Sequence, residues 1–244
     1  MRIEPTVLVL DGSDAPRGAL LMRLRRMGYR ALRAKTPEEA FALVEEPRHA
    51  VQAALIPPDL AVANTRAALE TLSAHAPTGA LGFVLAGPCP PEETLAEMRE
   101  AGVKLALWEP LDDARLRFQV NRALAGADPS ALLRRDAMRA PLEVAAQIVQ
   151  AGRSKEARVY SLSVGGAYLE TQRPAMRGAK VEIEIELWPS TIRAAGVVTY
   201  TSVPGNLRKT NLPLGMGVKF ESLDEGSLAR VRRAVAEVSL QLTV

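Results

Sequence analysis

SLSVGGAYLE, residues 161–170, places two serines and two adjacent glycines between stretches that alternate apolar and polar side chains. KEARVYSLS upstream and GGAYLET downstream both follow a period of two. This alternation predicts half-buried strands, and the short connection rich in Gly and Ser predicts a hairpin turn. The simplest reason for the glycines is a turn that needs positive φ. A binding role would require a second element elsewhere whose chemistry matches the turn.

Further strand-like stretches surround this hairpin, with Gly, Pro or Asn between them. They are LEVAAQIVQAG, KVEIEIELW, RAAGVVTYTS and GMGVKFES. The last stretch, GSLARVRRAVAEVSL, instead places Leu228, Val231, Val235 and Val238 on one helical face. The second half therefore predicts a six-stranded antiparallel β-barrel followed by a C-terminal helix.

The first half predicts a different architecture. Five apolar strand-like runs, from TVLVL at residue 6 to VKLALW at residue 103, each precede a stretch with helical spacing. Strict alternation of strand and helix predicts an α/β doubly wound parallel sheet. The cluster AGADPS at 125–130 interrupts both patterns. We therefore expect two domains, residues 1–126 and 127–244.

Composition narrows the functional class. The net charge is +3; residues 128–244 hold 16 Lys and Arg against 12 Asp and Glu, an excess that suits an anionic partner. Aromatic residues make up 4% of the chain and do not alternate with basic ones, which argues against nucleic acid as a ligand.

No leader peptide and no apolar run of about 20 residues is present, so we expect a cytoplasmic protein without membrane insertion. Cys89 is the single cysteine, so we expect neither a disulfide framework nor a metal site.

Catalysis is not expected, because no carboxylate pair, Ser/His arrangement or P-loop accompanies the two histidines, His49 and His75. No cofactor is expected either.

The first domain resembles the receiver domain of two-component signalling, through VLVLDGSD at its first strand and AGVKLALWEP at its last. Of the family's paired metal-binding carboxylates only Asp11 remains. The residues at the other phosphorylation positions are Ile56 and Pro57 for the phosphoacceptor Asp, Ala86 or Gly87 for the Ser/Thr, and Glu109 for the Lys. Phosphoryl transfer depends on charge placed around the phosphate, so the resemblance implies a pseudo-receiver that serves as an interaction surface.

The second domain resembles the PilZ domain, a receptor module for cyclic di-GMP. The resemblance rests on the pair Arg135 and Arg139, on the turn with Ser161, Ser163 and Gly166, and on Gly215, Gly217 and Phe220. It implies ligand-binding roles for Arg134, Arg135, Arg139, Ser161, Ser163, Gly166 and Gly217. Guanidinium groups pair with phosphates and guanine edges, Ser163 would offer its hydroxyl, and Gly166 would let the backbone approach a base. The family usually has Asp or Asn where this chain has Ser161.

Two functional hypotheses follow. In the first, the protein is an adaptor in which cyclic di-GMP orders the linker at residues 134–139 and changes the surface offered to a protein partner. In the second, it is a nucleotide-independent scaffold for protein interactions, for example in motility or cell polarity. The intact arginine pair favours the first, whereas Ser161 and the degenerate receiver favour the second. In both, the first domain is expected to mediate association with a protein partner or a second copy.

Overall fold

A computed structural model describes residues 4–11, 18–60, 65–76, 80–126, 138–150, 152–204 and 211–244. The chain forms two compact units, Met1–Arg135 with Gln241–Val244, and Asp136–Leu240. The domain boundary expected between residues 126 and 127 stays a prediction, because residues 127–137 lie outside the described ranges. No helix in the described residues has the length and apolar character needed to cross a bilayer.

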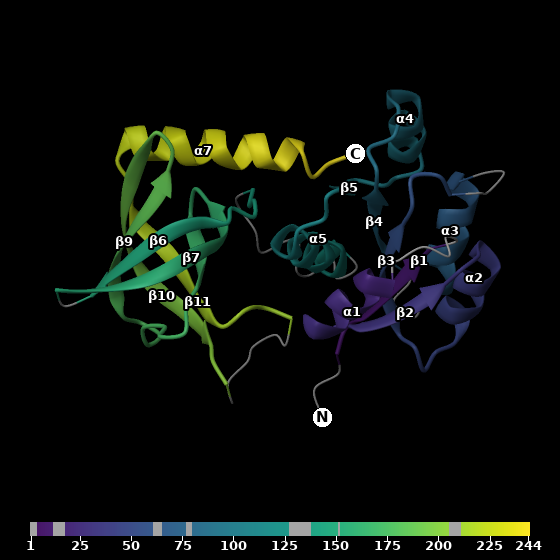
Figure 1. Cartoon of the computed structure of the whole chain (residues 1–244), viewed down its shortest axis with the longest axis horizontal. Coiled ribbons are helices and arrows are strands. Elements are labelled where there is room, and N and C mark those ends of the chain that lie inside the picture. The colour runs from purple at the N-terminus through teal and green to yellow at the C-terminus, as the bar shows by residue number, and fades with distance from the viewer. Residues whose placement is uncertain are drawn as a thin grey trace. The chain divides into compact units, whose positions relative to one another are not determined.

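The first unit contains a five-stranded parallel sheet in the order β2-β1-β3-β4-β5 (Figure 1). Its strands are β1 (Thr6–Leu10), β2 (Arg30–Ala34), β3 (Val51–Ile56), β4 (Gly82–Gly87) and β5 (Leu105–Trp108). Its helices are α1 (Gly18–Arg26), α2 (Pro37–Glu45), α3 (Thr65–His75), α4 (Glu92–Glu100) and α5 (Asp113–Gly126). This is the order of the flavodoxin-like and receiver folds, so the predicted doubly wound sheet is confirmed.

Local sequence explains where α2 begins. Thr36 has extended backbone and its Oγ1 accepts a hydrogen bond from the Glu39 amide at 3.3 Å. The Glu39 carboxylate in turn accepts from the Lys35 amide at 2.7 Å, and Pro37 occupies the first helical turn. These reciprocal bonds satisfy amides that would otherwise lack partners at the helix start.

The second unit is a closed antiparallel barrel in the order β10-β11-β8-β7-β6-β9. Its strands are β6 (Val144–Gln150), β7 (Arg153–Ser163), β8 (Gly166–Glu170), β9 (Lys180–Leu187), β10 (Ser190–Ser202) and β11 (Gly215–Ser222), followed by α7 (Glu225–Leu240). The six predicted strands and the C-terminal helix are therefore confirmed. Closure pairs β9 with both β6 and β10, so the barrel has no unpaired edge strand.

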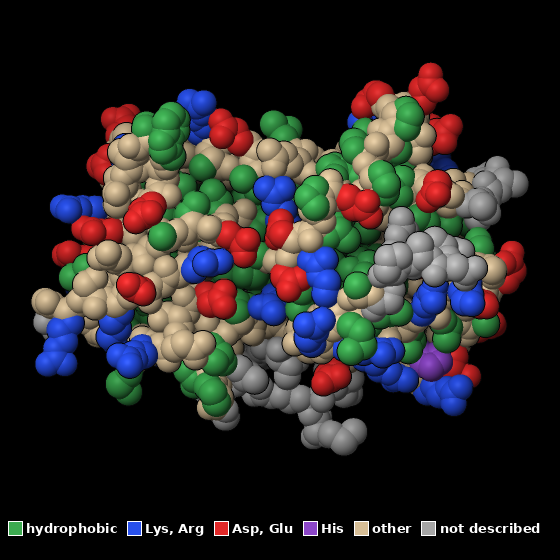
Figure 2. Space-filling model, viewed as in Figure 1, with side chains coloured by type: hydrophobic (Ala, Val, Ile, Leu, Met, Phe, Trp, Pro, Cys, Tyr) green, Lys and Arg blue, Asp and Glu red, His purple; other side chains and the backbone are tan. Residues whose placement is uncertain are grey.

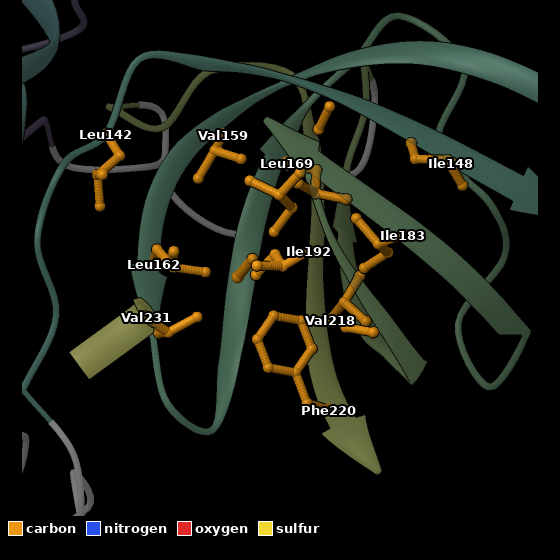
Figure 3. Packing of buried hydrophobic residues seen from close by; sticks show 14 of the residues in the cluster. Leu142, Ile148, Val159, Leu162, Leu169, Ile183, Ile192, Val218, Phe220 and Val231 are labelled. Carbon is orange, nitrogen blue, oxygen red and sulfur yellow. The ribbon is translucent and has the colours of Figure 1, made fainter. Parts of the chain in front are cut away.

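The barrel core combines inward side chains of all six strands with Val231 and Val235 from α7. Figure 3 shows Val159, Leu162 and Leu169 among the side chains that meet in this interior. Asp224 immediately precedes helix α7, and its carboxylate accepts a hydrogen bond from the Ser227 amide at 2.8 Å. Hydrogen bonds from Ser227 lower the pKa of Asp224, because they favour its charged form.

Candidate nucleotide-binding site

The stretch at residues 161–170 forms the predicted hairpin, but its glycines serve a different purpose from the one expected. Strand β7 ends at Ser163, β8 begins at Gly166, and Val164 and Gly165 connect them. Neither glycine has positive φ. The expectation that the turn needs glycine for its backbone dihedrals is therefore wrong.

Close packing explains Gly166 instead. A Cβ atom at this position would lie 2.2 Å from the carbonyl oxygen of Val218 on the neighbouring strand β11. Gly165 is exposed, and a Cβ there would meet nothing within 4 Å. The barrel requires glycine at 166 before any ligand is considered, whereas position 165 is open.

A β-bulge in β7 decides which way the two serines face. Val159 pairs with Leu169 and Ser161 with Tyr168, so the register shifts by one residue between these pairs. As a result Val159 and Leu162, three residues apart, both belong to the barrel core. Ser161 and Ser163 flank Leu162 and so lie on the other face of the strand.

Both serines are buried, with 5% of Ser161 and 1% of Ser163 exposed. The Ser163 hydroxyl donates a hydrogen bond to the carbonyl oxygen of Gly166 at 3.1 Å. Its proton is therefore used within the hairpin in this conformation. The donor role expected for Ser163 toward a ligand stays a prediction that requires this bond to be exchanged.

Ser161 begins a row of paired residues that crosses four strands. Ser161 pairs with Tyr168, Tyr168 with Gly217, and Gly217 with Tyr200. The neighbours of Tyr168 and Gly217 along their strands belong to the core, so this row lies on the outer face of the barrel. The row places two aromatic rings next to a serine on this face, and Tyr168 and Ser161 are both buried, with 2% and 5% exposed.

The tyrosines explain Gly217. A Cβ atom at Gly217 would lie 2.2 Å from Cε1 of Tyr200, and the Tyr200 and Tyr168 ring centroids are 5.8 Å apart. The Tyr168 hydroxyl donates to the carbonyl oxygen of Pro213 at 2.6 Å, and burial raises the pKa of Tyr168 above its usual range. Gly217 thus provides space for an aromatic ring. Both tyrosines were missed in the sequence analysis. Tyr168 alternates with the core residues Ala167 and Leu169, whereas Tyr200 reaches the outer face through a register shift after Val198 that no regular period predicts.

The structure brings one of the predicted arginines next to the serine strand. Ala140 and Leu162 form an antiparallel bridge, with N to O distances of 3.0 Å and 2.9 Å. Arg139 immediately precedes this bridge and is exposed. The backbone of Arg139 is therefore held close to the strand segment Ser161–Ser163, because the next residue, Ala140, is hydrogen-bonded to Leu162 in the middle of that segment. Arg134 and Arg135 lie outside the described residues.

The first unit has a cavity at the carboxyl ends of its strands, where a receiver carries its phosphorylation site. The cavity has a volume of about 510 Å³, and Ile56, Ala86 and Glu109 line it with mainly apolar neighbours. Asp11 at the end of β1 is buried and lies 3.7 Å from a guanidinium nitrogen of Arg33. The described residues contain no group of three or more His, Cys, Asp or Glu suited to a metal ion.

The surface of the second unit carries both signs of charge. On the viewed face, acidic and basic side chains are interspersed over the barrel (Figure 2). Of the acidic strand residues, Glu184 lies 2.8 Å from Nε of Arg193 on β10, so the VEIEIE alternation is the outer face of a strand. The described part of this face therefore carries no extended patch of a single charge sign, and an anion would have to bind at a small group of basic residues.

Comparison with protein families identifies this barrel. The family model described as PilZ domain matches residues 133–237. The second unit is a PilZ domain. Gly166, Gly217 and the strand with Ser161 and Ser163 lie within the matched residues, on the outward-facing side of the barrel strands. No curated protein matched the chain.

Among solved structures, the chain is similar to the Bacillus subtilis inhibitor of motility MotI/DgrA, with 17% identity and a TM-score of 0.37 over 44% of this chain. The matched part of this chain covers 52% of the solved inhibitor chain, about half its length. A CheY-like receiver domain protein from Methanospirillum hungatei is 18% identical, with a TM-score of 0.45, 52% of this chain and 99% of that one covered. A two-component response regulator from Clostridium difficile is 16% identical, with a TM-score of 0.44 and coverages of 51% and 99%.

We predict that the first unit takes up no phosphoryl group from acetyl phosphate with magnesium, because an isoleucine, Ile56, ends β3 and Glu109 places an anion where the receiver family has a lysine. Intact-mass spectrometry of the full chain checks this, with a functional receiver domain treated in parallel. A gain of one phosphoryl mass on this chain would contradict the prediction.

We predict that Gly166→Ala lowers the stability of the barrel by roughly 1–3 kcal/mol, because its Cβ would be forced against the carbonyl of Val218. Gly165→Ala is the matched control, since it adds the same methyl group to the adjacent open position and should change stability by under about 1 kcal/mol. Urea unfolding followed by circular dichroism measures both. Equal stability of the two variants would show that the close approach is not the reason for the glycine.

Proposed function

We propose that the protein is a signalling adaptor whose PilZ domain binds cyclic di-GMP and thereby changes what it offers to a protein partner. The observation that carries this proposal is the bridge between Ala140 and Leu162, which holds Arg139 beside the serine strand. A PilZ barrel with a receiver-like unit suits an adaptor, since each supplies a surface. No chemistry beyond binding is required.

The proposed chemistry joins an exposed cation to a surface with space for a base. A guanidinium group binds phosphate oxygens or the O6 and N7 atoms of guanine through two parallel hydrogen bonds. The proposal assigns this role to Arg139 and to Arg134 and Arg135, which precede it in the sequence. The exposed Gly165 follows Leu162, the bridge partner of Ala140, in the same hairpin, and a Cβ atom there would meet nothing within 4 Å.

Ser161 sets the expected affinity. An ionised Asp would present two acceptor oxygens to the N–H donors of a guanine edge, whereas a serine hydroxyl is shorter and neutral. Loss of a bidentate base contact weakens binding by roughly 1–3 kcal/mol. The proposal therefore includes weak binding by the natural chain.

A second candidate function is a scaffold that binds protein partners without a nucleotide. Two observations favour it: the buried Ser161 and Ser163 side chains, and the mainly apolar cavity at the position of a receiver's phosphorylation site. In this alternative the receiver-like sheet and the barrel are docking surfaces for a protein partner or a second copy. Absence of cyclic di-GMP binding by the full chain, together with partner capture, would favour it.

We predict that Arg139→Ala weakens cyclic di-GMP binding by about tenfold to a hundredfold, because a charged hydrogen bond contributes roughly 1.5–3 kcal/mol. Arg153→Ala removes the same charge from the opposite end of β7, where Arg153 pairs with Gln150, and should leave the affinity unchanged. Isothermal titration calorimetry on the two full-length variants measures the difference. Equal affinities would place the ligand elsewhere.

We predict that Ser161→Asp raises the affinity for cyclic di-GMP by about tenfold, because it supplies a bidentate acceptor. Without ligand the same variant should melt at a lower temperature, since position 161 is buried and the new charge lacks a partner. Ser154→Asp adds the same charge to an exposed position of β7 and serves as the control. If Ser161→Asp binds no more tightly than the natural chain, this turn does not read a guanine.

A further inference from the structure

The outer edge of β5 in the first unit is covered by the segment Gln241–Val244. The Ala106 amide donates to the carbonyl oxygen of Leu242 at 3.1 Å, and the Val244 amide donates to that of Lys104 at 3.4 Å. Leu105 and Thr243 form the antiparallel pair between these two bonds. Figure 1 marks the C-terminal end beside β5. The segment therefore pairs through one antiparallel bridge with an edge that would otherwise be open.

A buried side chain recognises the backbone of this segment. Gln119 on α5 is 0% exposed, and its Nε2 donates to the carbonyl oxygens of Ala106 at 2.8 Å and Leu242 at 2.6 Å. One amide hydrogen thus binds the sheet and the other binds the added segment. If the segment left, a buried N–H would lose its partner, which is unfavourable because the group would be desolvated without a hydrogen bond.

Alternate side chains of the segment provide apolar anchors. Leu242 is 1% exposed, and Val244 packs against the core cluster of the first unit. Gln241 and Thr243 are exposed. Main-chain bonds to a sheet edge with anchors at every second residue are the features by which sheets bind extended peptides.

We propose that the edge of β5 and Gln119 form a binding site for an extended peptide segment with a leucine anchor, and that the partner it fits is residues 241–244 of a second copy. In a single copy the chain's own segment fills the site. The two hydrogen bonds to β5 and two anchors make a small contact, held in place by the high effective concentration of an attached segment. The proposal needs no nucleotide and is independent of the proposed function.

A labelled peptide of residues 239–244 with both ends blocked tests the site directly. Fluorescence anisotropy should show it binding a chain that ends at Leu240, and binding the full chain at least about tenfold more weakly because the site is filled. The peptide with Leu242→Asp should not bind. The peptide with Thr243→Asp carries the same charge at the exposed position and should bind like the natural one. Equal binding to both chains, no binding at millimolar concentration, or equal behaviour of the two Asp peptides would overturn the proposal.

A second measurement covers the case in which the shortened chain does not fold. In the full-length chain, Leu242→Asp should speed hydrogen exchange of the Ala106 amide, whereas Thr243→Asp should leave it slow. Gln119→Met, which keeps the side-chain length and removes the amide hydrogens, should also speed that exchange. Exchange at Ala106 that none of these changes alters would show that the segment does not form the site.

Discussion

The backbone bridge between Ala140 and Leu162 is the constraint on which the candidate site depends. Its two hydrogen bonds join the chain entering the barrel to the middle of the strand that carries Ser161 and Ser163. The bulge just before Ser161 determines which residues the bridge brings together, because it puts Leu162 into the core and the serines on the outer face. Without either feature, Arg139 and the hairpin would be separate surface elements. Together they place a cation, a short turn and two tyrosine rings on one side of a closed barrel.

The first unit combines a receiver-like sheet order with an isoleucine at the end of β3 and a glutamate after β5. The sheet order needs buried apolar strands, and β1 and β3 supply them. Phosphorylation needs an acidic acceptor and a lysine at the strand ends, and there Ile56, Ala86 and Glu109 line a mainly apolar cavity instead. Selection for the sheet alone explains this pattern if the unit serves as a binding surface. The covered edge of β5 is one place where such binding has a structural basis.

Periodicity predicted most of the architecture from the sequence. Alternation and helical spacing identified all six barrel strands, the C-terminal helix and the five strand-helix units, because burial of one face imposes those periods. The same reasoning could not explain Gly166, since the atom that excludes a side chain there belongs to Val218, far along the chain. Contacts of this kind follow from strand order and register. The bulge in β7 could not be predicted from a regular period of two either, because it inserts one extra residue into that period.

Site residues were predicted less completely, for related reasons. Motif spacing selected Arg139, and the structure brings it to the serine strand, but Arg134 and Arg135 lie outside the described residues. In the sequence, Tyr168 and Tyr200 are typical strand residues, and only the strand register shows that both lie next to Gly217. Residues 241–244 carried no pattern of their own, and only pairing with β5 gives them a role.

In the proposed function, the Ala140–Leu162 bridge positions a nucleotide-responsive linker on the barrel. Hydrogen exchange of the full chain, followed with and without cyclic di-GMP, tests this role. We expect slow exchange of the Ala140 and Leu162 amides in both states and a gain of protection at residues 134–139 only with the ligand. Unchanged exchange at residues 134–139 at a ligand concentration that saturates the protein, or fast exchange at Ala140 in the free protein, would contradict it.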